Sequence, residues 1–364
     1  MAAQGFSFEQ RAGRTARGAY RGLAYFSLIF LSCLLPASFA AGDEKPTSQP
    51  PSIQPSTQHS SGDPDARVEI TPRVKSANIA PAVRGDIRID STLVLINVTV
   101  TDPLNRFVTG LEKEHFKLLE DKVPQEIAQF SSEDAPLSVG LVFDTSGSMG
   151  AKLQKSRLAA AEFFKTSNPE DEFFLAEFND RPKLAVPFTH SPEEIQNSLT
   201  FTESKGRTAL LDAVYLAMNT MHKAHNPRKA ILVISDGGDN SSRYTESEIK
   251  NAVREADVQV YAIGIFESMS SRGRTAEEMN GPSLLSQLAE QTGGRAFQVD
   301  NVNELPDIAA KIGIELRNQY VLGYSPTNKE RDGKYRHVQV KLVQPRGLPP
   351  LKAYYRLGYY APYR

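Results

Sequence analysis

Residues 137–319 alternate between short apolar runs and segments with the periodicity of amphipathic helices. The apolar runs predict strands over 138–143, 171–178, 184–188, 229–234, 258–265 and 295–299. The periodic segments predict helices over 152–166, 191–199, 209–225, 245–256, 283–292 and 303–318. Because strands and helices alternate, we expect an α/β fold, with a doubly wound, mostly parallel sheet in a domain spanning 135–319.

Both flanks of this segment are predicted to be rich in β-structure. Residues 67–134 contain the β-branched run 91–101, and residues 320–364 contain the alternating run 335–343. Because the two ends of an inserted domain usually lie close together, we expect the flanks to pack against each other. The fold class is therefore a Rossmann-like α/β domain with a β-rich module built from the N- and C-terminal segments.

The N-terminus has the composition of an export signal. Residues 1–22 carry four arginines and a single acidic residue, and 23–35 form an uncharged apolar run. Ser38 and Ala40 then supply small residues before a cleavage point, which predicts a signal peptide over 1–40. The apolar run is short for a membrane span of about 20 residues, so we expect no stable span after cleavage. An uncleaved N-terminal anchor is the alternative, and periplasm, cell surface and medium are all compatible.

Composition excludes several classes of site and partner. Residues 41–66 are rich in proline and serine and contain no aromatic residue, which predicts a disordered linker. Cys33 is the only cysteine, so intramolecular disulfides and cysteine-ligated zinc or iron–sulfur sites are excluded. The chain carries 42 basic and 43 acidic residues, and this net charge of −1 argues against nucleic acid as a partner.

Polar residues follow two of the predicted buried strands. The run DTSGS at 144–148 follows the first strand of the domain, Thr208 opens a helix, and Asp236 ends another strand. Ligands of open α/β sheets bind outside the carboxyl ends of the strands, so these side chains are expected to meet there. Carboxylate and hydroxyl oxygens suit a hard divalent cation, which predicts magnesium, with manganese or calcium as alternatives.

The predicted metal ligands are Asp144, Ser146, Ser148, Thr208 and Asp236. Two carboxylates are too few to enclose a divalent cation, so at least one coordination position should remain for water or an external acid. The alternative is a purely structural role for the DTSGS run, as a strand-to-helix turn whose hydroxyls cap the helix. Asp239 and Asn240 are interpreted as turn residues or as indirect supports of the site. Arg207 is either a solvated surface residue or a group that steers an acidic ligand.

At these residues the chain resembles the von Willebrand factor A family, whose hallmark is an Asp-x-Ser-x-Ser run with a later Thr and Asp. The resemblance covers about 137–318, and the flanks are similar to bacterial exported members of that family. It implies a doubly wound fold with a metal-ion-dependent adhesion site on top of the sheet.

The same resemblance implies a role for each ligand. Ser146 and Ser148 would bind the metal directly, and Thr208 would bind directly or through water. Asp144 and Asp236 would act largely through water. A glutamate or aspartate of a protein partner would complete the octahedron.

The function expected from these features is an exported, metal-ion-dependent protein-binding module of the adhesion type. The alternative is an envelope scaffold protein in which the cation only stabilises the fold. A hydrolase would need a base beside Ser146 or Ser148, and no histidine lies near them in the sequence, so we expect no enzyme.

Overall fold

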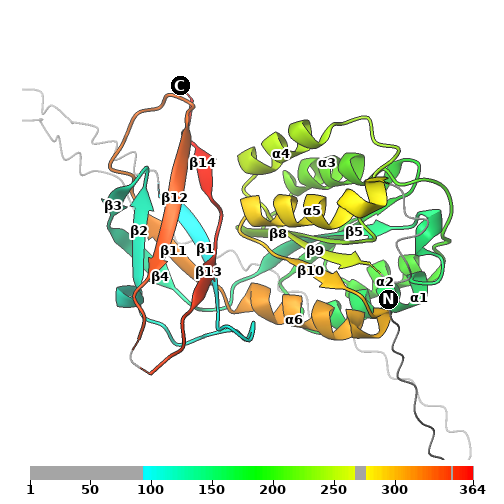
Figure 1. The fold of residues 1–364 in the computed structure, drawn as a ribbon, viewed down its shortest axis with the longest axis horizontal. Helices are drawn as coiled ribbons and strands as arrows, with labels where there is room; N and C mark the ends of the chain where they lie inside the picture. The colour runs from blue at the N-terminus through cyan, green and yellow to red at the C-terminus, as the bar shows by residue number, and fades with distance from the viewer. Residues whose placement is uncertain (1–92, 267–275, 346, 364) are drawn as a thin grey trace, which may run out of the picture. The chain divides into compact units, whose positions relative to one another are not determined.

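The computed structural model describes residues 93–266, 276–345 and 347–363, all within one compact unit that spans Arg84–Arg364 (Figure 1). The predicted signal peptide and linker lie outside the described residues. None of the helices among the described residues is long and apolar enough to cross a membrane.

The centre of the fold is a six-stranded sheet with the order β10-β9-β8-β5-β6-β7. All neighbouring strands are parallel except β7, which runs antiparallel to β6. Every residue of β5, β6 and β9 is buried, as expected of parallel strands covered on both faces. The strands are β5 (Leu137–Asp144), β6 (Glu172–Phe178), β7 (Pro182–Thr189), β8 (Arg228–Ser235), β9 (Gln259–Ile265) and β10 (Ala296–Val299).

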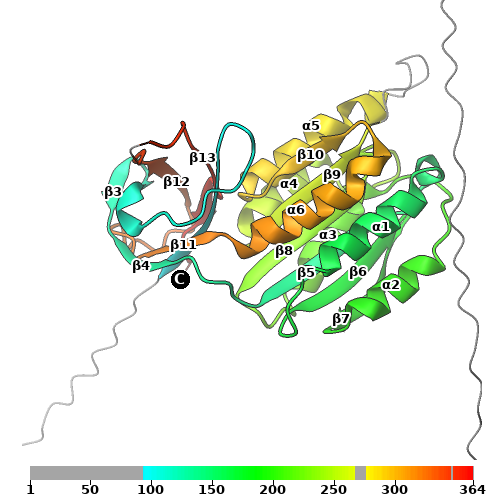
Figure 2. The same cartoon turned by 90° about the horizontal axis from the view of Figure 1, so that it is seen from below.

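Six helices cover the two faces of this sheet (Figure 2). Helices α1, α2 and α6 contribute to one apolar core, and α3, α4 and α5 contribute to the other. The predicted doubly wound α/β fold is thereby confirmed. The helices are α1 (Leu153–Phe164), α2 (Pro192–Thr200), α3 (Leu210–Met221), α4 (Glu246–Glu255), α5 (Ala276–Gln291) and α6 (Leu305–Arg317).

Two predicted helix ends differ from the structure. Helix α5 begins at Ala276 rather than at 283, so that Pro282 lies inside it. An internal proline costs a helix one hydrogen bond and strains the preceding turn, but it does not always end the helix, and α5 continues through Gly281–Pro282. Helix α3 ends at Met221 rather than at 225, and the following turn closes through 3₁₀-type bonds such as Lys223 N to Thr220 O (3.0 Å).

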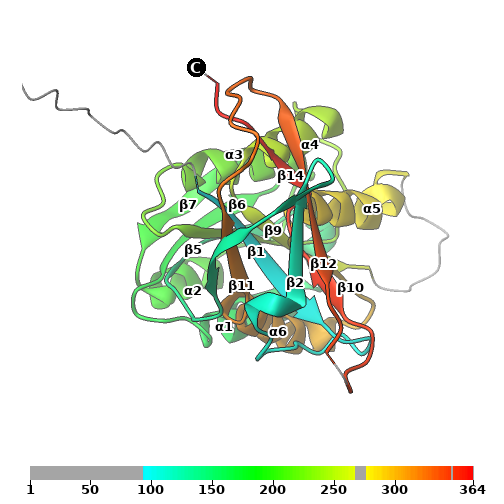
Figure 3. The ribbon, with the colours of Figure 1, turned by 90° about the vertical axis from the view of Figure 1, so that its left-hand side faces the viewer.

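The two flanks together form a β module of two four-stranded antiparallel sheets (Figure 3). One sheet has the order β13-β1-β11-β4 and the other has the order β14-β12-β2-β3. Strand β1 pairs with β11 from Val94↔Tyr324 to Val98↔Tyr320, and β2 pairs with β12. The strands are β1 (Val94–Thr101), β2 (Phe116–Glu120), β3 (Val123–Gln125), β4 (Ile127–Ser131), β11 (Tyr320–Tyr324), β12 (Tyr335–Leu342), β13 (Lys352–Tyr354) and β14 (Gly358–Tyr360).

A buried polar network joins the β module to the α/β part of the chain. Gln319 donates hydrogen bonds to Thr99 Oγ1 in β1 (3.2 Å) and to the Tyr261 hydroxyl in β9 (3.1 Å). The Tyr261 hydroxyl in turn donates to Glu315 Oε1 (3.1 Å), and Arg295 Nη1 pairs with Glu315 Oε2 (2.9 Å). Since these groups are all buried, each hydrogen bond replaces one that water would otherwise make. Short 3₁₀ turns complete the fold: η1 (Lys113–His115), η2 (Gly147–Met149) and η3 (Val302–Glu304).

Candidate metal centre

The DTSGS loop begins where strand β5 ends, at Asp144. The Asp144 side chain is fully buried. Its Oδ1 accepts a hydrogen bond from Ser146 N (2.8 Å), and its Oδ2 accepts one from Ser235 Oγ (2.5 Å), at the end of neighbouring β8. These two bonds fix the carboxylate at the carboxyl edge of the sheet and turn the chain toward η2 and α1.

The two serine hydroxyls of the loop lie next to each other. Ser146 Oγ and Ser148 Oγ are 3.1 Å apart. Neighbouring ligand atoms of an octahedral magnesium site, with bonds of about 2.1 Å, lie about 3 Å apart. The spacing therefore fits two adjacent ligands of a single cation.

A second loop, which carries Thr208, is held against the first. Gly147 N donates to Gly206 O (3.0 Å), and Ser204 Oγ donates to Ser146 O. Gly206 has a φ of +82°, and a Cβ there would lie 2.4 Å from Asp180 Oδ2, so this turn requires glycine. The loop thus brings the buried Thr208 to the same edge of the sheet as the DTSGS loop.

Asn240 and Asp239 support this second loop through its backbone. Asn240 Oδ1 accepts from Thr208 N (3.0 Å), and Asn240 N donates to Thr208 O (2.9 Å). Asp239 Oδ1 accepts from Leu210 N (2.9 Å) at the start of α3. Arg207 is exposed, and its guanidinium donates to Asn240 O. Both polar residues therefore hold the Thr208 loop in place, whereas Arg207 lies at its surface.

Asp236 follows strand β8 and is 7% exposed. Burial, and then the charge of Asp236, raise the pKa of Asp144 from 3.8 to about 7. The two carboxylates therefore lie close enough to repel each other in a site with little water. Such a pair favours any cation that can lie between or beside the two acids.

Lys152 supplies a cation that sequence reasoning missed. Its Nζ lies 3.1 Å from Asp236 Oδ2, and its side chain is only 14% exposed. Lys152 is the N-cap residue of α1, so the helix that follows the DTSGS loop directs this ammonium to the site. A lysine shortly after the motif was visible in the sequence, but nothing in the pattern indicated where its flexible side chain would reach.

The donor set fits a hard divalent cation, since it consists of carboxylate and hydroxyl oxygens. The part of the chain that the structure describes contains no group of three or more His, Cys, Asp or Glu residues that could hold a metal ion. A cation at this edge would therefore depend on the hydroxyls of Ser146, Ser148 and Thr208 as well as on the two carboxylates.

Comparisons with known proteins show what part of the chain is similar to. Residues 139–238 match the family model of the von Willebrand factor type A domain. The chain is 23% identical over 283 residues to the inter-alpha-trypsin inhibitor heavy chain H4 of Bos taurus, covering 72% of this chain and 29% of that protein. It is 24% identical over 187 residues to an uncharacterized protein of Borreliella burgdorferi, covering 46% of this chain and 55% of that protein. A similar solved structure, von Willebrand factor type A from Catenulispora acidiphila, has a TM-score of 0.44 and 12% sequence identity. The match covers 74% of this chain and 75% of that chain.

Proposed function

We propose that this protein is an exported, metal-ion-dependent protein-binding module of the adhesion type, because residues 139–238 match the family model of the von Willebrand factor type A domain. The cation is magnesium, with manganese or calcium as alternatives, and the partner offers a glutamate or aspartate carboxylate. The observation that carries the proposal is the pair of Ser146 and Ser148 hydroxyls, 3.1 Å apart like neighbouring metal ligands, in the loop that begins at the buried Asp144.

Each residue of the centre has a separate task in this proposal. Ser146 and Ser148 bind the cation directly, and Thr208 binds it directly or through water. Asp144 and Asp236 hold the water ligands and neutralise the charge. Bound magnesium supplies an open coordination position for the partner's carboxylate.

Lys152 would compete with a metal ion for the charge of Asp236. The Lys152 ammonium lies 3.1 Å from Asp236 Oδ2 and compensates its charge. A divalent cation at the same carboxylate repels this ammonium, so metal binding exchanges one cation for another. The ammonium would therefore lower the metal affinity relative to a site without the lysine.

We further propose that the site is not catalytic. The Ser146 and Ser148 hydroxyls hydrogen-bond each other, and the hydrogen bonds found within the described residues join neither of them to a histidine. A nucleophilic serine needs an adjacent base, and hydroxyls that ligate a metal are not available for attack.

The test is capture of partners in two buffers. The full chain is immobilised and exposed to an envelope extract of its source in magnesium or in EDTA. We expect partners that elute with EDTA and that are not captured by Asp144→Asn, a near-isosteric change that removes the negative charge. Equal capture in both buffers by a folded chain would exclude a metal-bridged partner.

The alternative, a scaffold protein with a purely stabilising site, is favoured by one observation. The Lys152–Asp236 pair already supplies a cation without metal. In a scaffold, EDTA lowers the unfolding temperature but leaves partner capture unchanged after correction for the folded fraction. In an adhesion module, EDTA abolishes partner capture even at temperatures at which the chain is still folded.

A further inference from the structure

The loop that carries Asp236 lies directly against helix α5. Gly237 has a φ of +78°, and a Cβ on it would lie 2.9 Å from Gly281 Cα. A Cβ on Gly281 would in turn lie 2.7 Å from the carbonyl carbon and oxygen of Gly237. Backbone therefore meets backbone at this contact, and neither residue has room for a side chain.

Glycine at position 281 is unfavourable for the helix itself. Gly281 is buried inside α5 and precedes Pro282, and glycine and proline are the two residues that destabilise a helix interior most. Alanine at this position would favour the helix but would collide with the backbone of the Asp236 loop. The close approach of Gly237 is therefore the feature that requires glycine here.

The ring of Phe266 packs against Gly237 as well. Phe266 follows strand β9 and is 8% exposed, and its Cζ lies 3.1 Å from the position of a Cβ on Gly237. Gly281 and Phe266 thus enclose Gly237 from two different elements, and we refer to these two residues as the Gly237 support.

Gly237 is joined to the candidate metal centre through its neighbours in the sequence. Gly237 N donates to Ser235 Oγ (2.9 Å), and the same hydroxyl donates to Asp144 Oδ2 (2.5 Å). Asp236 lies between Ser235 and Gly237, and its Oδ2 is 3.1 Å from Lys152 Nζ. A displacement of Gly237 must therefore change the position of the Asp236 carboxylate relative to Asp144.

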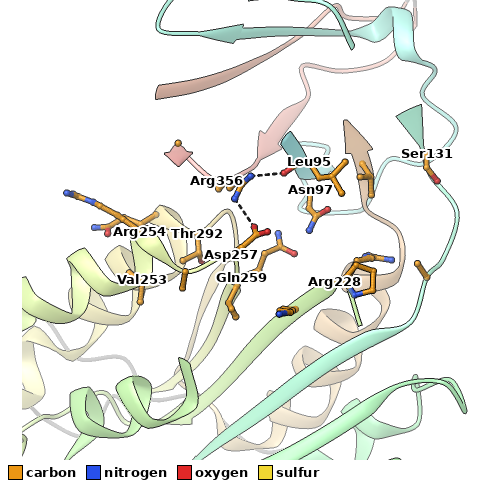
Figure 4. Close-up of a pocket in the computed structure, with 18 of the residues that line it drawn as sticks. Leu95, Asn97, Ser131, Arg228, Val253, Arg254, Asp257, Gln259, Thr292 and Arg356 are labelled. Atoms are coloured by element: carbon orange, nitrogen blue, oxygen red, sulfur yellow. Dashed lines mark hydrogen bonds and ion pairs between the residues drawn. The ribbon is translucent and has the colours of Figure 1, made fainter. Parts of the chain in front are cut away.

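Helix α5 is held in place at both ends of its buried face. Leu285 and Leu288 are buried in the apolar core. Just beyond the end of the helix, Thr292 forms a β-bridge with Arg356 in the wall of a cavity of about 240 Å³ (Figure 4). Because a close-packed helix gives way less easily than a loop, a side chain added at Gly281 should displace the Asp236 loop.

We propose that Gly281 is a positioning residue of the candidate metal centre, which together with Phe266 fixes Gly237 and thereby the Asp236 carboxylate. This inference rests on the metal-dependent function proposed above, and it adds that α5, which contains none of the five predicted ligands, tunes the choice of cation. Mg²⁺ demands near-ideal octahedral geometry, whereas Ca²⁺ accepts flexible arrangements of oxygen ligands. A rigidly held Asp236 therefore favours magnesium over calcium.

The experiment compares magnesium and calcium binding by calorimetry in the full chain and in Gly281→Ala. Displacement of Asp236 should weaken magnesium binding by about tenfold or more, as is usual when a support of a metal ligand is lost. Calcium binding should weaken less, so the ratio of magnesium to calcium affinity should fall. A mere loss of folded protein lowers both apparent affinities alike and leaves this ratio unchanged.

Gly313→Ala is the matched control. Gly313 is a buried helical glycine of α6, and a Cβ on it would collide with Thr166, which follows the end of α1. Thr166 lies at the other end of α1 from Lys152, which contacts the candidate metal centre. This variant should lower the unfolding temperature and keep the wild-type affinity for both cations.

A second readout needs no metal ion. In EDTA, hydrogen exchange of residues 236–241 reports whether the loop keeps its hydrogen bonds, among them the bond from Gly237 N to Ser235 Oγ. Exchange should be faster in Gly281→Ala than in the wild type and in Gly313→Ala. If Gly281→Ala does not fold, Phe266→Leu, which shortens the other half of the Gly237 support, replaces it in both measurements.

The proposal is supported by a lower ratio of magnesium to calcium affinity together with faster exchange of residues 236–241. An unchanged ratio in the folded variant overturns it. A wild type that binds neither cation overturns the proposed function instead, and the exchange of residues 236–241 then decides alone whether Gly281 positions the loop.

Discussion

Buried charges are paired at one edge of the large sheet and only partly compensated at the other. At the amino edge, Arg295 Nη1 pairs with Glu315 Oε2 at 2.9 Å, and the other Glu315 oxygen accepts from Tyr261. At the carboxyl edge, Asp144 and Asp236 repel each other, and one ammonium, that of Lys152, compensates them. Both groups of side chains are buried, but only the first is neutral within the chain.

The difference separates structural charges from binding charges. A buried ion pair with all its hydrogen bonds made holds parts of the fold together and has nothing left for a ligand. A buried group whose charge is not balanced destabilises the fold until something from outside balances it. The carboxyl edge has an excess of negative charge, which favours the binding of a cation.

The largest effect should come from breaking the neutral pair. Arg295→Met leaves the fully buried Glu315 without its ion partner and should lower the free energy of unfolding by about 3–5 kcal/mol. Urea unfolding measures this loss. Calorimetry on Arg295→Met should give the same magnesium affinity as the wild type, because the pair lies away from the candidate metal centre. The double variant Arg295→Met/Glu315→Leu should recover part of the stability. A loss below about 1 kcal/mol would mean that this pair is not structural.

Lys152→Met should have a smaller effect in free energy. It should strengthen magnesium binding. The change keeps the apolar stem but removes the ammonium beside Asp236, so magnesium affinity should rise by about tenfold. The metal-free protein should become less stable, because two repelling carboxylates lose their compensation. Lys155→Met, on the same helix, should change neither quantity. Unchanged or weaker magnesium binding in Lys152→Met would contradict the proposed exchange of cations.

Asn240→Ala should have the smallest effect of the three. It removes the side-chain acceptor for Thr208 N and leaves the metal ligands in place. A net loss of about 1 kcal/mol for one hydrogen bond corresponds to about fivefold weaker magnesium binding. Ser241→Ala is the matched control, because Ser241 holds Thr208 O only through its backbone N–H. If both variants bind magnesium alike, Asn240 does not support the site.

The sequence was sufficient to predict the fold class, because the buried parallel strands are continuous apolar runs. It was less informative for the β module. Residues 116–130 form β2, β3 and β4, three short strands for which the sequence predicted only a β-rich segment. Strand β3 pairs with β2 in one sheet, and β4, after the single residue Glu126, pairs with β11 in the other. A crossing between sheets depends on partners distant in sequence, which local alternation does not encode.

The candidate metal centre likewise has one part that the sequence predicts and one part that it does not. The structure places Asp144, Asp236 and the Thr208 loop at one edge, as the rule for the carboxyl ends of parallel strands predicts. Their role as metal ligands stays a prediction. Lys152 could not have been found in this way, because a long flexible side chain reaches its partner through packing and not through sequence spacing.

The measurement that tests the account most directly is magnesium calorimetry on the metal-free full chain and on Asp144→Asn. Asparagine keeps nearly the same shape and removes the carboxyl group that, when ionised, adds negative charge to the carboxyl edge. We expect the wild type to bind a single magnesium ion and the variant to bind at least about a hundredfold more weakly, as the loss of one buried charge interaction implies. A wild type that binds no divalent cation, or a variant that binds equally well, would contradict the assignment of the carboxyl edge as a metal centre.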